Sequence, residues 1–183
     1  RTLFVSLGST ATPRPVGFDG QFEAMPAVSG PEESAGSMFG PPAADGGGGP
    51  GRNMEYRAAE ILDPDAGPPM ALWARLRGGR PLTRAGIAFV ADMVPPGIAR
   101  AAGMMGGGPS LDNSLRFGRL DVEPEWVLLE LRGHMAYGAH GHGSVRVWSQ
   151  EGDLLAVGGQ SANMFHMMRA DEAGDLNAMR RRS

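Results

Sequence analysis

Carboxylate, carboxamide and imidazole side chains recur in the second half of the chain, where they could hold water and move a proton. Asp112 follows Gly108-Pro109-Ser110 and can either accept a proton from water or cap that turn. Asp92 stands near the end of an expected helix, where it can line a site or cap the next turn; we expect the cap. Gln160 is by itself an ordinary polar residue, which orients water only where other groups converge on it.

Three histidines raise the possibility of a metal centre. The pattern His140-x-His142 puts two imidazoles on one strand face, and His134 lies six residues upstream. A zinc site needs three or four ligands, and the chain has no cysteine and no evident supporting carboxylate. We therefore expect neither a metal nor another cofactor.

The composition excludes several classes of function. All 17 basic residues are arginine, so the chain has no lysine that could form a Schiff base. The absence of cysteine excludes a disulfide framework and a thiol nucleophile. A net charge of −3 argues against a nucleic-acid-binding protein. No apolar run approaches the roughly 20 residues that span a bilayer.

Glycine and proline divide the chain into two parts. They make up 18 of residues 1–51 but only 26 of the remaining 132. Residues 1–7 are typical of a strand, which we interpret as the last strand of a preceding unit. Residues 8–51 are predicted to be a connector without helix or sheet pairing, held on a folded surface by apolar side chains, namely Phe18, Phe22, Met25 and Phe39. For residues 40–51 plain disorder is an equal alternative. Residues 166–183 are interpreted as a polar tail.

The elements that must position the polar residues are one helix and a set of strands. Apolar residues at helical spacing predict a helix over Thr83–Val94, with Thr83 able to cap its start and Pro95-Pro96 ending it. Alternating patterns predict six strands: Arg52–Ile61, Met70–Arg77, Leu111–Arg119, Trp126–Tyr137, Ser144–Ser149 and Leu154–Met164. This order favours an α+β architecture, in which one helix lies on a mostly antiparallel sheet.

Several runs together resemble a known family. They are Phe89-Val90-Ala91-Asp92-Met93, Ser110-Leu111-Asp112-Asn113-Ser114-Leu115-Arg116-Phe117, Glu125-Trp126-Val127-Leu128-Leu129, Trp148-Ser149-Gln150-Glu151-Gly152-Asp153-Leu154-Leu155-Ala156, and Gln160. As a set they resemble the second half of the type II acyl-CoA thioesterases, which carry two hotdog units in one chain. The resemblance implies a hotdog fold over residues 52–165, in which a curved antiparallel sheet wraps one central helix. It also implies pairing with a second hotdog unit, either upstream or in another copy.

The same resemblance implies an activity and a catalytic set. The reaction is hydrolysis of a fatty acyl-CoA thioester by a water molecule, which is held by an Asp, a Gln and a Thr or Ser. The resemblance further implies a cytoplasmic enzyme of lipid metabolism. The Asp corresponds to Asp112 and the Gln to Gln160, whereas the hydroxyl position falls at His134, where this sequence departs from the family pattern. An imidazole can donate and accept hydrogen bonds, so His134 can replace the hydroxyl. The alternative is that the substitution marks a lobe whose activity is lost. That lobe would be a binding or scaffold module.

The expected strands allow a check on this set. Alternation places Asp112 and His134 on the face opposite Val127, Leu129 and Leu131, where a second unit would cover them. The interpretation requires Asp112 and Gln160 to converge on one water molecule.

Substrate contacts are predicted nearby. Asp92 can line the site, Met93 suits a deformable acyl pocket, and Arg116 can meet the phosphates of CoA. Core packing and a solvated surface position are the alternative interpretations of Met93 and Arg116.

Overall fold

The architecture is given by a computed structural model, which describes residues 5–12, 17, 19–37, 53–63, 69–119, 121–165 and 167–169. The statements below concern these residues. Two residues of the expected connector, Phe18 and Phe39, lie outside the described residues. Residue 166 and residues 170–183 of the expected tail also lie outside them.

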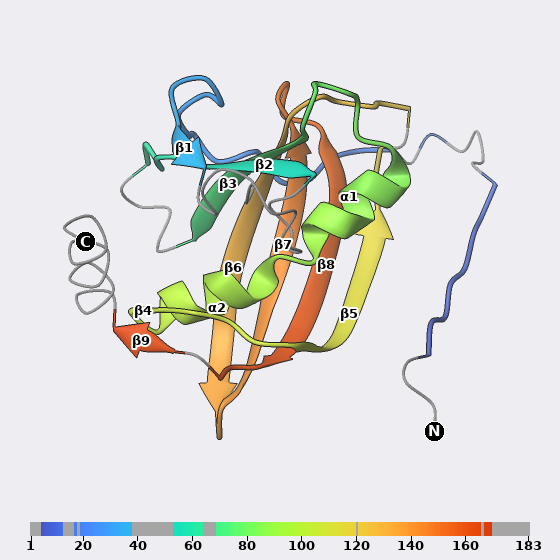
Figure 1. The fold of residues 1–183 in the computed structure, drawn as a ribbon. Helices are drawn as coiled ribbons and strands as arrows, with labels where there is room; N and C mark the ends of the chain where they lie inside the picture. Colours follow the sequence, from blue (N-terminus) through green and yellow to red (C-terminus); the bar gives the residue numbers. More distant parts are fainter. Residues whose placement is uncertain are drawn as a thin grey trace.

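The main sheet has seven antiparallel strands in the order β1-β2-β3-β6-β7-β8-β5 (Figure 1). They are β1 (Ala35–Ser37), β2 (Met54–Ala58), β3 (Met70–Leu76), β6 (Val127–Tyr137), β7 (His140–Ser149), β8 (Leu154–Asn163) and β5 (Ser110–Phe117). A separate two-stranded sheet joins β4 (Met104–Met105) to β9 (Met168–Arg169). All six expected strands are present. Their alternating residues correspond to the two faces of the sheet.

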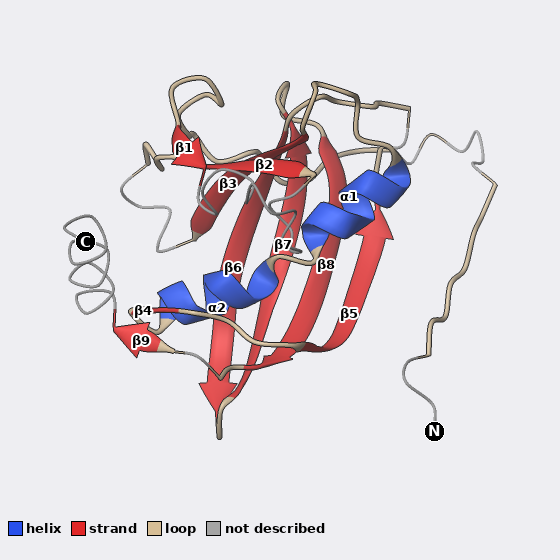
Figure 2. Cartoon of the chain, in the orientation of Figure 1, coloured by secondary structure: helices blue, strands red, loops and turns tan. Residues whose placement is uncertain are grey.

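The helical segment lies across one face of this sheet as two short helices, α1 (Arg84–Ala91) and α2 (Val94–Ala101) (Figures 1 and 2). Thr83 caps α1 as expected, because its side chain accepts a hydrogen bond from the Gly86 N–H. The expected stop at Pro95-Pro96 is wrong. These prolines occupy the first turn of α2, where a missing N–H costs nothing because the helix itself offers those groups no partner.

Two strands contain irregularities that affect the candidate site. The β5–β8 register shifts between Ser110 and Asp112, and the β6–β7 register shifts between Gly133 and Met135. Each shift is a β-bulge, in which an extra residue locally disturbs the alternation of side chains. His134 therefore lies in a bulge rather than in a regular strand position.

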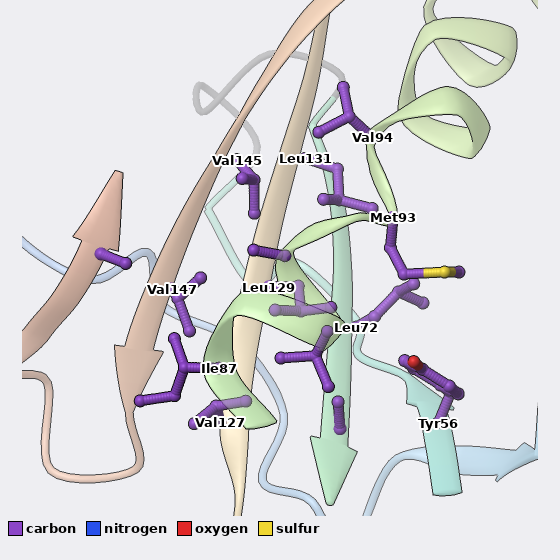
Figure 3. Packing of buried hydrophobic residues seen from close by; sticks show 14 of the residues in the cluster. Tyr56, Leu72, Ile87, Met93, Val94, Val127, Leu129, Leu131, Val145 and Val147 are labelled. Atoms are coloured by element: carbon purple, nitrogen blue, oxygen red, sulfur yellow. The ribbon is translucent and has the colours of Figure 1, made fainter. Parts of the chain in front are cut away.

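The core fills the space between the helices and the sheet. Leu129 and Leu131 from β6 and Val145 and Val147 from β7 are at most 1% exposed and point toward the helical segment (Figure 3). A second buried cluster covers part of the opposite face of the sheet, and consists of Ala71, Trp73, Trp126, Leu128 and Trp148.

Part of the expected connector contributes to this fold. Ala35–Ser37 pairs with β2 and Val28 forms a bridge to Ile61, so the prediction that the glycine- and proline-rich stretch avoids sheet pairing is wrong here. Met25 packs against the tryptophan-rich cluster as expected, whereas Phe22 is 85% exposed. Residues 5–12 have no regular structure, so the expected strand over residues 1–7 is not seen in its described part.

Helix α2 approaches the sheet closely because the facing positions are glycines. A Cβ on Gly97 would lie 2.8 Å from the Leu131 Cβ, and one on Gly133 would lie 2.8 Å from the Ala101 Cβ. At Gly143 the added atom would lie 2.5 Å from the Arg132 carbonyl oxygen and 2.8 Å from Val94 Cγ1. These distances are below ordinary contact, so a methyl group at any of the three positions displaces the helix or a strand.

We expect Gly143→Ala to lower the free energy of unfolding by about 1–3 kcal/mol, since overpacking forces backbone shifts of this cost. Denaturant unfolding of the full-length protein measures the change. Gly8→Ala is the matched control, because its added Cβ meets no atom within 4 Å. Equal stability of the two variants would contradict the close approach of α2.

Candidate functional site

An exposed carboxylate stands at the break between the two helices. Asp92 is the C-cap residue of α1, and its backbone N–H still donates to the Phe89 carbonyl. Its side chain does not cap the following turn, contrary to our expectation. Its Oδ1 instead accepts hydrogen bonds from three side chains, of Gln160, of Asn113 at 3.1 Å and of Ser110 at 3.4 Å.

One of the three donors to Asp92 is a buried carboxamide, that of Gln160. Gln160 on β8 is 0% exposed, and its Nε2 donates to Asp92 Oδ1 and to Ser110 Oγ at 2.6 Å. Its Oε1 accepts the backbone N–H of Val94 at 3.2 Å, which is the first N–H of α2. A buried amide with both ends bonded avoids the penalty for unpaired polar groups. Gln160 thus ties the sheet to the start of α2 and fixes Asp92.

Two further groups border Asp92 from the core. Met93 is the N-cap residue of α2 and only 8% exposed, so it belongs to the core cluster. Tyr56 on β2 is 1% exposed. Burial, and to a smaller extent the negative charge of Asp92, raise the pKa of the Tyr56 phenol to about 12. The phenol therefore stays protonated beside the carboxylate at neutral pH.

Asp112 lies on the other face of β5. Its neighbour Asn113 pairs directly with Gln160 and turns toward Asp92, so alternation directs Asp112 away from that face. The Asp112 Oδ1 accepts the backbone N–H of Ser161 at 2.8 Å, beside the bulge. The structure thus does not bring Asp112 and Gln160 together around one water molecule.

His134 lies on the same outer face, as the alternation predicted for it and Asp112. Its Nε2 is 2.8 Å from Ser144 Oγ, and its ring centroid is 6.2 Å from that of His142. His142 in turn bonds through Nδ1 to Ser161 Oγ at 3.1 Å. His134 also borders a hollow of about 410 Å³, which is otherwise lined by α2 and β6 residues: Ile98, Ala101, Ala102, Gly133, Met135 and Ala136.

The remaining candidates have simpler surroundings. Arg116 is exposed on β5 and donates to the Leu115 carbonyl at 3.1 Å. Within the described part of the chain, no three histidine, cysteine, aspartate or glutamate side chains gather as a metal site would require. His140 bonds to the Gly138 carbonyl at 2.9 Å in the β6–β7 turn.

Sequence reasoning missed two members of the site. Ser110 and Asn113 flank Asp112 and contact Asp92 and Gln160, which Asp112 itself does not. The available signal was the alternation along β5, which places Asn113 on the face opposite Asp112. The bulge brings Ser110 to the same side as Asn113, and this bulge cannot be predicted from the residue types.

The arrangement can hold a water molecule and take a proton. All three hydrogen bonds reach Asp92 Oδ1, and in the described part of the chain no hydrogen bond to Oδ2 is seen. A fixed carboxylate with one available oxygen is suited to general-base chemistry on a bound water.

The fold finds counterparts among known proteins. The family model of the acyl-CoA thioesterase C-terminal domain matches residues 22–164. A solved protein from Novosphingobium aromaticivorans, described as a thioesterase, is 30% identical, with a TM-score of 0.67 over 84% of this chain. The chain belongs to the family of acyl-CoA thioesterase C-terminal domains. This confirms the resemblance to the type II thioesterases.

More distant structures agree in the fold. Acyl-CoA thioesterase II TesB2 from Mycobacterium marinum is 22% identical and has a TM-score of 0.61, with 85% of this chain and 59% of that chain covered. A protein with a hot dog fold from Alicyclobacillus acidocaldarius is 19% identical, with the same TM-score over 83% of this chain and 58% of that chain. The hotdog fold is therefore confirmed.

The chain spans about 58% of the length of the Novosphingobium protein. No curated protein matches it. Among the described residues, neither helix has the length and apolarity that crossing a membrane requires.

Proposed function

We propose that the protein containing this chain hydrolyses fatty acyl-CoA thioesters to the free acid and CoA, as an enzyme of lipid metabolism, and that Asp92 holds the attacking water. The observation that carries the proposal is the exposed Asp92 carboxylate, tied by the fully buried Gln160 to the sheet and to the first turn of α2. Family membership supports the class of reaction.

The proposed reaction uses the second oxygen of the carboxylate, Oδ2. Asp92 Oδ2 accepts a proton from water while the water oxygen attacks the thioester carbonyl carbon. The tetrahedral intermediate then expels the thiolate of CoA, which takes the proton back, and the C–S bond is broken. Gln160 is a positioning residue in this scheme, since it is fully buried and orients Asp92 without touching the water.

The resemblance implies catalytic roles for Asp112 and His134. We keep these roles as a competing assignment. Their contacts are with the Ser161 backbone and the Ser144 hydroxyl, on the face away from Gln160. The same contacts favour the second candidate function, a lobe that binds or supports a partner without catalysis. Substitution of Asp92 and of Asp112 separates these alternatives.

The proposed partner is a second hotdog unit that completes the substrate site. Ser110 and Asn113 are exposed on β5, the last strand of the sheet order, and both donate to the exposed Asp92. A unit placed against this edge would cover the carboxylate and exclude bulk water. Arg116 shares the strand face of Asp112, so a CoA phosphate would reach it only by crossing the β5 edge.

Release of free thiol from a panel of acyl-CoAs tests the proposal, with the full-length protein. We expect saturable hydrolysis of fatty acyl-CoAs and loss of it in Asp92→Asn. Absence of hydrolysis for every chain length, in a protein that folds and still binds CoA, would favour the non-catalytic lobe and overturn the proposal.

A further inference from the structure

An ester or thioester that water attacks develops a negative charge on its carbonyl oxygen, and this oxyanion needs hydrogen-bond donors. The donors must lie close to the group that holds the water, here Asp92. In many proteins the N–H groups at the start of a helix meet such a charge. Helix α2 begins two residues after Asp92, so its first turn is the nearest backbone source.

The first turn of α2 cannot supply these donors. An α-helix leaves about four N–H groups without an internal partner at its start. The N–H of Val94 is already bonded to Gln160 Oε1, and Pro95 and Pro96 have no N–H. Met93, at the N-cap position, is buried in the core. The Val94 N–H and the two prolines are thus excluded, and the side chains around Asp92 are the candidates that the structure places beside the base.

Four side chains around Asp92 carry a hydrogen that can be donated. Gln160 is 0% exposed and Tyr56 is 1% exposed, so a substrate can reach neither the amide nor the phenol. The Ser110 hydroxyl directs its hydrogen to Asp92 and accepts one from Gln160. Asn113 is exposed, and its Nδ2 makes one described hydrogen bond, to Asp92 Oδ1 at 3.1 Å. An amide nitrogen has two hydrogens, so Asn113 retains one for a ligand.

We propose that Asn113 is the oxyanion donor of this site, so that the same side chain contacts the base and the developing charge. This inference rests on the proposed function. Its first hydrogen orients Asp92, and its second meets the thioester carbonyl oxygen while a water on Asp92 Oδ2 attacks the carbonyl carbon. The 3.1 Å contact keeps the base and the donor in adjacent positions, as attack on a carbonyl requires.

The test compares two CoA analogues on the full-length protein. In one, a trifluoromethyl ketone replaces the thioester carbonyl and adds water to give a tetrahedral form that carries an oxyanion. In the other, a methyl ketone stays trigonal. We expect the wild type to bind the first at least 100-fold more tightly. We expect Asn113→Ala to reduce this ratio at least tenfold and kcat about 100- to 1,000-fold, with the affinity for the methyl ketone nearly unchanged.

Ser114→Ala is the matched control. Ser114 is the next residue of the same strand, is exposed, and donates to the Gly159 carbonyl rather than to the Asp92 group. The control should keep the binding ratio and kcat of the wild type. A structural role of Asn113 would instead weaken both analogues equally.

The outcomes separate this inference from the proposed function. If the wild type is active and Asn113→Ala keeps the full binding ratio, or weakens both analogues equally, Asn113 is not the donor and only the inference falls. If the wild type hydrolyses no acyl-CoA and prefers neither analogue, the proposed function falls and the inference with it.

Discussion

Asp92→Asn is expected to lower kcat/KM for acyl-CoA hydrolysis by about 100- to 10,000-fold, because it removes the proposed base and leaves the shape of the side chain intact. The amide oxygen of the new residue can still accept from Gln160, Asn113 and Ser110, whose hydrogen bonds hold the native carboxylate. The protein should therefore fold normally. Thiol release from the acyl-CoA substrate measures the effect.

Asp112→Asn is the matched comparison. Its amide oxygen can still accept the Ser161 N–H, so we expect less than a threefold change in kcat/KM. Full activity of Asp92→Asn combined with an inactive Asp112→Asn would reverse the assignment in favour of the set that the resemblance implies. In that case Asp92 is only an acceptor that helps to hold Gln160.

Gln160→Leu is expected to damage both the fold and the activity. Leucine has a similar size but leaves the N–H of Val94 without its acceptor and Asp92 without its buried donor. An unsatisfied buried group costs about 1–3 kcal/mol, so we expect a loss of that order in the free energy of unfolding. Hydrolysis should fall at least tenfold, because Asp92 is no longer fixed. Denaturant unfolding and thiol release on the full-length protein measure the two effects.

Gln150→Leu controls for the chemistry of the substitution, since Gln150 lies exposed in the β7–β8 turn. We expect its stability to stay within about 0.5 kcal/mol of the wild type. If Gln160→Leu were equally harmless, the buried carboxamide would contribute nothing to the site, and the structural basis of the proposed function would be lost.

The fold could be predicted because its signals are local and repeated. Alternating residues on β3 and β6 predict the strands, and Thr83 marks the start of α1 by its capping chemistry. The end of the helix could not be predicted from Pro95-Pro96, because prolines can follow the last turn of one helix or occupy the first turn of the next. Tertiary packing of α2 on facing glycines decides between the two.

The site was predicted only in part, for a geometric reason. Gln160 was identified by its resemblance to a family position, and it does lie at the centre of the site, but beside Asp92 rather than Asp112. Neighbouring strand residues face opposite ways, so the choice of partner depends on register and on a single bulge at the start of β5. Neither can be derived from residue types alone.

The position of β5 has a practical consequence for anyone who produces this lobe by itself. The strand has eight residues, lies last in the sheet order, and is mostly exposed, with Leu111 at 56% and Phe117 at 40%. Its outer row of amide and carbonyl groups forms a template to which a strand of any neighbouring copy can add, which is a common origin of aggregation. Expression trials should therefore keep the lobe joined to a covering unit, or place charged residues on this edge.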